Sequence, residues 1–375
     1  MPTLGPTLGE VVDLVHGWYP PETADDWDAV GLAAGDPRAG VRRILLSLDP
    51  VLTTAQEAAE WDADLLLTHH PLFLRGVHGV AETTPKGRTL ATLTRAGCGL
   101  LTAHTNADQA SPGVNDAMAR ALGLRDVLPV RPSGRPLDKL VVFAPPSDAD
   151  PIREAIAEAG AGRIGDYDSC SWAVSGEGRF RPLEGAHPVI GTVGDLEQLD
   201  EVRIEAVLPR SRRAAVVRAM LAAHSYEEVA FDVIELADSG TAPTGAGRIG
   251  DVEETTLGQY ADTVARALPP TARGVLVGGD PDRVVRRVAV GSGAGDFLLA
   301  EALTSGADVY VTSDLRHHPA AEFLEQGGPG LLDVSHWAAE WTWLPELADR
   351  LSDALGDTVE VRVSTICTDV WRARR

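Results

Sequence analysis

The chain has 375 residues and a mass of 39.7 kDa, and its 44% hydrophobic and 23% charged residues are typical of a folded protein, not of a disordered one. Its 33 basic and 55 acidic residues give a formal net charge of −22, which argues against general binding to nucleic acids or to an anionic membrane surface. The three cysteines lie far apart, and no stretch reaches the roughly 20 apolar residues of a membrane helix, so we expect reduced thiols, no membrane partner and a cytoplasmic protein.

Residues 1–135 contain alternating strand and helix patterns. The predicted elements are, in chain order, a strand at 41–48, a helix at 53–61, strands at 64–68 and 99–103, and a helix at 113–122. Strands that are separated by helices at this spacing predict βαβ units and a mostly parallel sheet. We interpret this region as the first lobe of an α/β core.

Residues 136–236 have a different pattern. The predicted elements are a strand at 139–144, a helix at 151–159, strands at 169–174 and 202–208, a helix at 211–223 and a strand at 229–236. The order βαββαβ predicts an inserted ferredoxin-like α+β domain.

Residues 245–375 repeat the plan of the first lobe. The predicted elements are a strand at 287–290, a helix at 296–305, strands at 308–312 and 330–334, and a helix at 340–351. ADLLLTHHP at 63–71 corresponds to ADVYVTSDLRHHP at 307–319, and GLLTAH at 99–104 corresponds to GLLDVSH at 330–336. This self-similarity predicts two pseudo-repeated α/β lobes that form one core, each with polar residues at its strand ends.

Histidines and carboxylates follow several of the predicted strands. The set consists of His69, His70, His104, Asp108, His336 and Glu340. His69 and His70 are adjacent, and a turn at the strand end could direct them toward two neighbouring metal ions. His336 and Glu340 are four residues apart, so on a helix they share one face. An imidazole and carboxylate set suits Zn, Mn or Fe, and one bridging carboxylate could join two ions.

The glycine-rich stretch 291–295, GSGAG, follows a predicted strand and precedes a predicted helix. Its backbone N–H groups could hold a phosphate or a carboxylate. A tight turn with close packing explains the same glycines at least as well, and both interpretations remain open.

The sequence resembles a known family at these residues. WDAVGL (27–32), LLLTHHPL (65–72), HTNAD (104–108), SDLRHH (313–318) and SHWAAE (335–340) are similar to motifs of the dinuclear-metal, hexameric toroid proteins of the NGG-one-interacting-factor-three type. Members of that family are commonly called homologues of a GTP cyclohydrolase I of type two. The inserted region is similar to the PII-like insert of longer bacterial members, on YDSCSWAVSGEGRFRP (167–182) and AHSYEEVAFDV (223–233).

The resemblance implies a ligand set for two divalent ions. His69 and Asp108 match the ligands of one ion, and His70 and His336 match those of the other. Glu340 matches the carboxylate that bridges them.

The resemblance also implies that further residues lie near the site. His104 and His318 are the candidates for catalytic proton transfer, and Asp314 and His317 match neighbouring positions. One departure is Ala29, which stands where family members usually carry Asn, so any hydrogen bond from that side chain is absent.

Two functions fit these observations. One is a metal-dependent hydrolase in which hydroxide attacks GTP or a related small molecule, with ring opening and release of formate. The other is a non-catalytic metal-binding scaffold or sensor with a regulatory PII-like module. The resemblance implies a homohexamer in either case.

Overall fold

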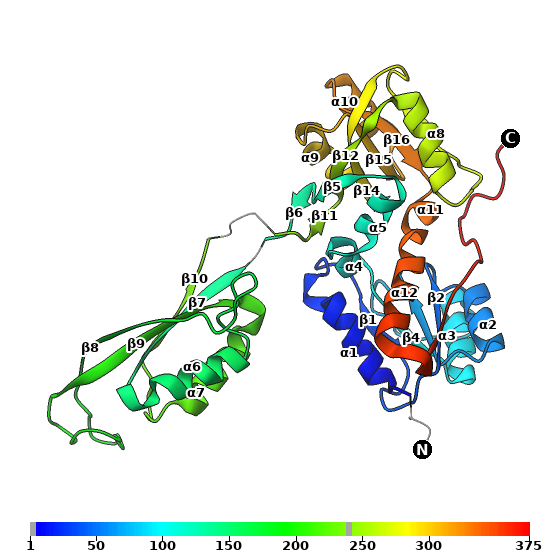
Figure 1. The fold of residues 1–375 in the computed structure, drawn as a ribbon. Coiled ribbons are helices and arrows are strands. Elements are labelled where there is room, and N and C mark those ends of the chain that lie inside the picture. The colour runs from blue at the N-terminus through cyan, green and yellow to red at the C-terminus, as the bar shows by residue number, and fades with distance from the viewer. Residues whose placement is uncertain (1–4, 135, 238–241) are drawn as a thin grey trace. The chain divides into compact units, whose positions relative to one another are not determined.

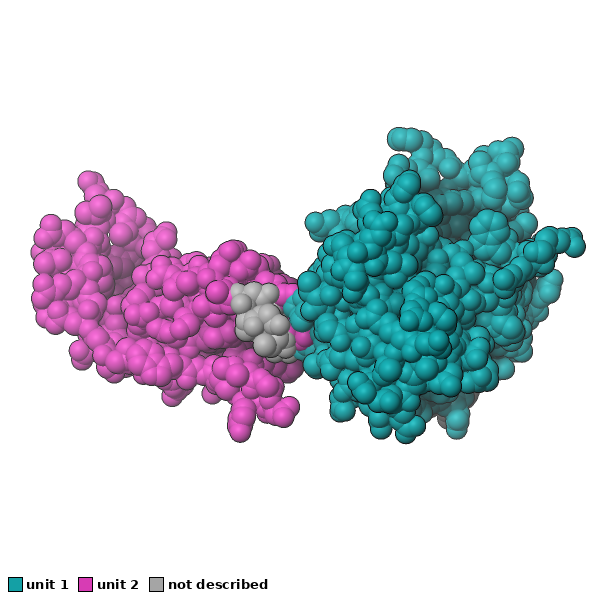
Figure 2. Space-filling view, turned by 90° about the horizontal axis from the view of Figure 1, so that it is seen from above, with its two compact units in different colours: residues 1–133, 243–375 teal, residues 134–242 magenta. Residues whose placement is uncertain are grey.

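The computed structural model describes residues 5–134, 136–237 and 242–375 and has a mixed α/β fold with several sheets, as expected. The chain forms two compact units, which Figure 2 colours teal and magenta. The first unit contains Met1–Ser133 and Pro243–Arg375, and the second contains Gly134–Ala242. We describe each unit separately.

The first unit contains a five-stranded sheet with the order β1-β4-β3-β2-β17. Its strands are β1 (Gly31–Ala34), β2 (Arg43–Ser47), β3 (Leu65–Thr68), β4 (Gly99–Thr102) and β17 (Glu360–Val363). All neighbours are parallel except β1, which runs antiparallel to β4 at the edge. Every residue of β3 and β4 is buried, as expected for parallel strands that are covered on both faces. The helices of this half are α1 (Leu8–Trp18), α2 (Leu52–Glu60), α3 (Pro85–Ala96), α4 (Thr105–Gln109) and α5 (Val114–Ala121).

The same unit contains a six-stranded sheet with the order β13-β16-β15-β14-β12-β5. Its strands are β5 (Arg125–Leu128), β12 (Arg248–Thr256), β13 (Leu276–Gly278), β14 (Val284–Ala294), β15 (Val309–Ser313) and β16 (Gly330–Val334). The central strands β14, β15 and β16 are parallel, and the outer strands are antiparallel to their neighbours. The helices are α8 (Leu257–Ala267), α9 (Leu299–Thr304), α10 (His317–Glu325), α11 (His336–Trp341) and α12 (Trp343–Leu355). A short ribbon pairs β6 (Arg131–Pro132) with β11 (Gly245–Ala246).

Two strands cross the division into lobes 1–135 and 245–375 that the sequence predicts. β5 belongs to the first range but pairs with β12 (Figure 1). β17 belongs to the second range but pairs with β2. Buried residues of both sheets belong to one hydrophobic cluster, in which the indole N–H of Trp343 donates to the Tyr19 hydroxyl at 3.2 Å. The guanidinium of Arg248, which is 1% exposed, pairs with Asp116 at 2.8 Å and adds a buried ionic link between the halves. The five-stranded sheet has four parallel strands and the six-stranded sheet has three, and each has an antiparallel edge strand. The pseudo-repeat itself stays a prediction.

The second unit has the element order βαββαβ that the sequence predicts. Its elements are β7 (Leu137–Ala144), α6 (Ala149–Glu158), β8 (Trp172–Phe180), β9 (Glu197–Pro209), α7 (Arg213–Ala223) and β10 (Phe231–Glu235). The strands form an antiparallel sheet with the order β10-β7-β9-β8. Residues such as Leu140, Ile152, Ile204 and Met220 are buried in a hydrophobic cluster of this unit alone, so the unit has its own core.

Among the described residues, no helix combines the length and the apolar character that a membrane crossing requires.

Candidate metal centre

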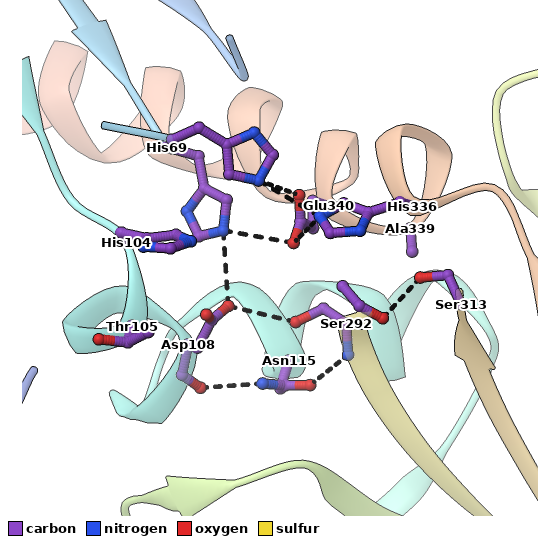
Figure 3. A network of polar contacts seen from close by, with 12 residues as sticks. His69, His104, Thr105, Asp108, Asn115, Ser292, Ser313, His336, Ala339 and Glu340 are labelled. Carbon is purple, nitrogen blue, oxygen red and sulfur yellow. Dashed lines mark hydrogen bonds and ion pairs between the residues drawn. The ribbon is translucent and has the colours of Figure 1, made fainter. Parts of the chain in front are cut away.

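Six of the candidate residues lie together in the first unit: His69, His70, His104, Asp108, His336 and Glu340. Figure 3 labels all of them except His70. His69 and His70 follow the end of β3, and His104 follows β4 and precedes α4, which carries Asp108. His336 and Glu340 lie on α11, which begins directly after β16. Three of the segments therefore start at the carboxyl ends of parallel strands, where ligands bind in open α/β sheets.

The carboxylate of Glu340 lies at the centre of the cluster and is only 2% exposed. Its Oε1 atom is 3.1 Å from Nε2 of His336 and 3.5 Å from Nε2 of His69. Its Oε2 atom is 3.0 Å from Nε2 of His70. One carboxylate thus faces three imidazoles with its two oxygens, which is the arrangement that a bridging ligand requires.

The remaining predicted ligand, Asp108, and the proton-transfer candidate His104 both lie near His69. Oδ1 of Asp108 is 3.6 Å from Nε2 of His69, and this oxygen also accepts a hydrogen bond from the Ser292 hydroxyl at 3.2 Å. The ring of His104 lies 5.1 Å from that of His69, measured between centroids. The cluster contains two groups of three residues, and within each group the ligand atoms all lie within 4.8 Å of one another. They are His69, His70 and His104, and His70, His336 and Glu340.

Each of the four site histidines has a protein partner at Nδ1. The partners are the Ala103 carbonyl for His69 at 2.9 Å, Asp49 for His70 at 2.7 Å, Asp28 for His104 at 2.8 Å and Asp314 for His336 at 2.7 Å. A carbonyl or an ionised carboxylate only accepts hydrogen bonds, so Nδ1 must be the protonated nitrogen in every ring. In the neutral ring Nε2 then presents a lone pair, and such outer partners are typical of histidines that bind metal ions.

Several atoms at the centre of the cluster need a cation. Nε2 of His70 and Nε2 of His336 face each other at 3.3 Å, and two lone pairs at this distance repel unless a proton or a metal ion compensates. Nε2 of His69 and Oε2 of Glu340 are buried and have no aligned hydrogen-bond partner among the described residues. Buried polar atoms without partners are costly, so the donor set fits divalent metal ions.

The charges in the cluster shift the protonation equilibria of its members. The negative charge of Glu340 is the main cause that raises the pKa of His336 to about 11, although burial opposes it. Burial lowers the pKa of His70, but Glu340 and Asp49 outweigh it and raise this pKa to about 10. Burial also opposes ionisation of Glu340, yet the surrounding imidazolium groups lower its pKa well below the usual value. Without a metal ion, protons supply the positive charge that the site requires.

Sequence reasoning missed the roles of two carboxylates that hold site histidines. Asp49 follows β2 and therefore lies at the same sheet edge as His69 and His70, so the rule that found the histidines could also have found it. Asp28 is part of the WDAVGL motif, and its Oδ2 also accepts from the hydroxyl of Thr105 at 2.6 Å.

The structure does not bring His318 to this cluster. The side chain lies in the exposed first turn of α10, and its ring contacts that of His317 with a centroid separation of 5.1 Å. His318 belongs to neither group of ligand atoms and lines neither of the cavities described next. The physical reason is a turn at Asp314, where φ is +55°, which separates the end of β15 from α10.

Two cavities reach the cluster, and each is lined by a different set of residues. The larger has a volume of about 400 Å³ and touches His104, Asp108, His336 and Glu340. The smaller has a volume of about 200 Å³ and touches His70 and His336 on another side. The cluster is therefore accessible to molecules larger than water, at least through the larger cavity.

Residues 291–294 of the glycine-rich stretch form the end of β14 and a wall of the larger cavity, and Gly295 follows the strand. A Cβ atom on Gly291 would lie 2.5 Å from the Tyr310 hydroxyl, and one on Gly295 would lie 1.8 Å from Oγ1 of Thr312. The backbone N–H of Ser292 donates to the side chain of Asn115 at 2.8 Å. Close packing thus accounts for these two glycines.

Comparisons with known proteins identify the family of the chain. The family model described as Duf34/NIF3 (NGG1p interacting factor 3) matches residues 6–370. The GTP cyclohydrolase 1 type 2 homolog of Mycobacterium tuberculosis is 47% identical over 367 residues, which cover 97% of this chain and 96% of that protein. The homolog of the same name in Bacillus subtilis is 37% identical over 331 residues, 88% of each chain.

Solved structures give the same result. A Bacillus cereus protein related to NIF3 has 35% sequence identity and a TM-score of 0.82, over 98% of both chains. A Staphylococcus aureus protein has 26% identity and a TM-score of 0.79, over 98% of this chain and 99% of that one. The family resemblance in the sequence motifs is confirmed, and this chain belongs to the Duf34/NIF3 family.

Proposed function

We propose that this protein is a dinuclear metal-dependent hydrolase that acts on GTP or a related nucleotide. The observation that carries the proposal is the position of Glu340, whose two oxygens face the Nε2 atoms of three histidines that are all oriented through Nδ1. In this proposal His69 and Asp108 hold one ion, His70 and His336 hold the other, and Glu340 joins them. The ligand types suit Zn, Mn or Fe.

Divalent ions at such a site supply a water-derived nucleophile near neutral pH and stabilise negative charge on the substrate. The protein must in addition orient the substrate and move protons. We assign proton transfer to His104, and two observations support this: Asp28 accepts from its Nδ1–H, and the residue lines the larger cavity with Asp108 and Glu340. The geometry offers no comparable position to His318.

The larger cavity supports a substrate with a planar ring and an anionic group. Two aromatic side chains line it and leave more than half of their surface exposed: Trp27 at 57% and Phe297 at 54%. The guanidinium of Arg131 also lines the cavity and lies 5.2 Å from the Phe297 ring centroid. Exposed aromatic rings stack on heteroaromatic bases, and a guanidinium binds phosphate. A guanine nucleotide meets both requirements, in keeping with the name of the relatives.

The reaction we propose is hydrolytic opening of the imidazole ring of guanine, with C8 released as formate. The test combines metal analysis of protein purified without added metal with an assay for formate from GTP. We expect formate release by the metal-loaded protein and its loss in Glu340→Ala. Glu346→Ala is the matched control, because Glu346 is half-buried and pairs only with Arg120 among the described residues. A fully metal-loaded protein that releases no formate would contradict the hydrolase proposal.

That negative result would favour a scaffold or sensor. The observation behind this alternative is the second unit, which has its own hydrophobic core and contributes none of the candidate ligands. We propose that this unit is a PII-like module that binds an effector. Binding of a small effector to the isolated range 134–242, measured by calorimetry, would support the module in either case.

We also propose that the chain assembles into a homohexamer, as the family resemblance implies. Closed symmetric assemblies are common among homo-oligomers. Light scattering should give a mass six times the 39.7 kDa of the chain, and a monomer at micromolar concentration would refute the assembly.

A further inference from the structure

The segment that follows β17 is held against the edge of the five-stranded sheet. Residues 364–371 form no helix or strand, and Figure 1 draws them in red near the C-terminus. Ser364 is 1% exposed, its N–H donates to the Leu46 carbonyl at 2.8 Å, and its hydroxyl donates to Glu57 at 2.5 Å. Because β17 is parallel to β2, the segment leaves the sheet in the same direction as the chain that leads from β2 to Asp49.

Thr368 contacts the carboxylate that orients one candidate ligand. Its hydroxyl donates to Oδ2 of Asp49, while Oδ1 of Asp49 accepts from Nδ1 of His70 at 2.7 Å. Both oxygens of Asp49 are thereby occupied, which fixes the plane of the carboxylate and, through it, the imidazole of His70.

Asp369 contacts Ser335, the N-cap residue of α11, which carries two further candidate ligands. Its Oδ2 accepts from the hydroxyl of Ser335, and Oγ of Ser335 in turn caps α11 by accepting from the N–H of Ala338 at 3.3 Å. Asp369 and Ser335 are 6% and 3% exposed, so water competes little for this contact. The helix that Ser335 caps carries His336 and Glu340.

We infer that Thr368 and Asp369 are positioning residues for the metal centre. Two consecutive residues of the C-terminal segment contact the supports of His70 and of α11, which come from opposite halves of the chain. The same segment lines the smaller cavity beside His70 and His336. The inference rests on the proposed metal centre, and it goes beyond the proposed function because it assigns a role to the segment and not to the reaction.

The inference predicts an asymmetric effect on two ions. Thr368 acts through Asp49 on His70, so its loss should weaken the proposed ion at His70 and His336 more than the proposed ion at His69 and Asp108. Asp369 acts through α11, which carries Glu340, so its loss should weaken the binding of both ions. Thr368→Val removes the hydroxyl at nearly constant volume, and loss of an outer-shell hydrogen bond typically costs 10-fold to 100-fold in metal affinity. We expect about tenfold weaker binding of one ion, and Asp369→Asn should have the same direction of effect.

The experiment is a competition titration of Zn²⁺ against a chelator, with thermal unfolding as the measure of folding. Thr368→Ser keeps the hydroxyl and should restore wild-type affinity. Thr358→Val is the matched control, because the Thr358 hydroxyl contacts only the Leu355 carbonyl among the described residues. Wild-type affinity for both ions in folded Thr368→Val and Asp369→Asn would overturn the inference. If Thr368→Val does not fold, Asp369→Asn decides.

A second readout needs no metal. Nitrogen-15 NMR of ring-labelled histidine in the metal-free protein should show His70 as a single hydrogen-bonded species, and Thr368→Val should shift or broaden that signal while the His104 signal stays unchanged. An unchanged His70 signal would contradict the inference. A wild-type protein that binds no Zn²⁺ but shows the His70 effect would instead refute the metal centre and leave the role of Thr368 standing.

Discussion

Gly293 leaves space for the carboxylate of Glu340. A Cβ atom at position 293 would lie 2.6 Å from Oε1 of Glu340 and 3.5 Å from Nε2 of His336. The backbone there has a φ of +68°, which itself favours glycine. The close contact with Glu340 and the left-handed backbone are two independent constraints that favour glycine at position 293.

Gly293→Ala should displace Glu340 and lower the metal content. Gly97→Ala is the matched control, because Gly97 has a φ of +69° and a Cβ atom there would meet no other atom within 4 Å. The left-handed backbone should cost each variant about 1 kcal/mol of unfolding free energy. Only Gly293→Ala should also lose bound metal, as measured by elemental analysis. Equal metal content in both variants would contradict a central role for Glu340.

Metal binding should release protons and strengthen as the pH rises. The pKa values of about 10 for His70 and about 11 for His336 mean that both rings carry an extra proton at pH 7 when no metal is bound. Metal ions bind the neutral ring, so those protons must leave. Calorimetry in two buffers of different ionisation enthalpy should show the release, and a binding heat that is independent of the buffer would contradict it.

The same pKa values predict how the metal-free protein responds to pH. Both pKa values lie above the ordinary value of 6.5, so the two imidazolium groups stabilise the fold fully below pH 6.5. This contribution decreases as the pH rises toward 10 and 11. Denaturant unfolding of the metal-free protein should therefore become easier between pH 7 and pH 10, and His336→Gln should reduce the slope.

Loss of the outer carboxylates should weaken the binding of the ion that we assign to His70 and His336. Asp49→Asn and Asp314→Asn each remove the charge that orients one of these rings, and we expect a 10-fold to 100-fold loss of metal affinity. Asp36→Asn is the control, since Asp36 pairs with Arg38 at the surface. Affinities that match the control in both variants would show that the rings are oriented by packing alone.

The second unit should be dispensable for the metal centre. The N–H of Ser133 donates to the Thr244 carbonyl at 2.8 Å, so the two ends of the first unit are already adjacent. A short Gly/Ser linker in place of 134–242 should close this gap and leave the metal content per chain unchanged. Glu340→Ala in the shortened chain should remove the metal. A folded, shortened protein without metal would show that the second unit builds the site.

Much of the site could be located from the sequence because the carboxyl ends of parallel strands share one edge. His69, His70 and His104 follow such strands, and their positions needed only the apolar runs before them. The spacing of His336 and Glu340 predicted one helical face, and both lie on α11 with 3.1 Å between their polar atoms. The pairing of His70, His104 and His336 with their carboxylates could not be read from local pattern, because each pair joins distant segments.

Two of the elements that were not predicted from the sequence are β17 and α1. β17 has four residues, Glu360–Val363, and it is a strand because β2 offers an open edge in the other half of the chain. The predicted elements do not include α1, although this helix begins with a capping box in which Thr7 and Glu10 exchange hydrogen bonds. β17 is missing from the predicted elements because it forms through long-range pairing with β2. α1 is missing although the sequence carries a local signal for it, the capping box.

The position of β17 determines when this protein can mature during synthesis. The five-stranded sheet has no partner for the outer edge of β2 until residues 360–363 have left the ribosome, and His336 and Glu340 also emerge after the whole second unit. A nascent chain therefore presents His69, His70 and Asp108 long before their counterparts exist. Contacts of such sequence separation form late in folding. All five candidate ligands are therefore present only after residue 340 has been made, and a translation product that ends before residue 360 would leave the outer edge of β2 unpaired.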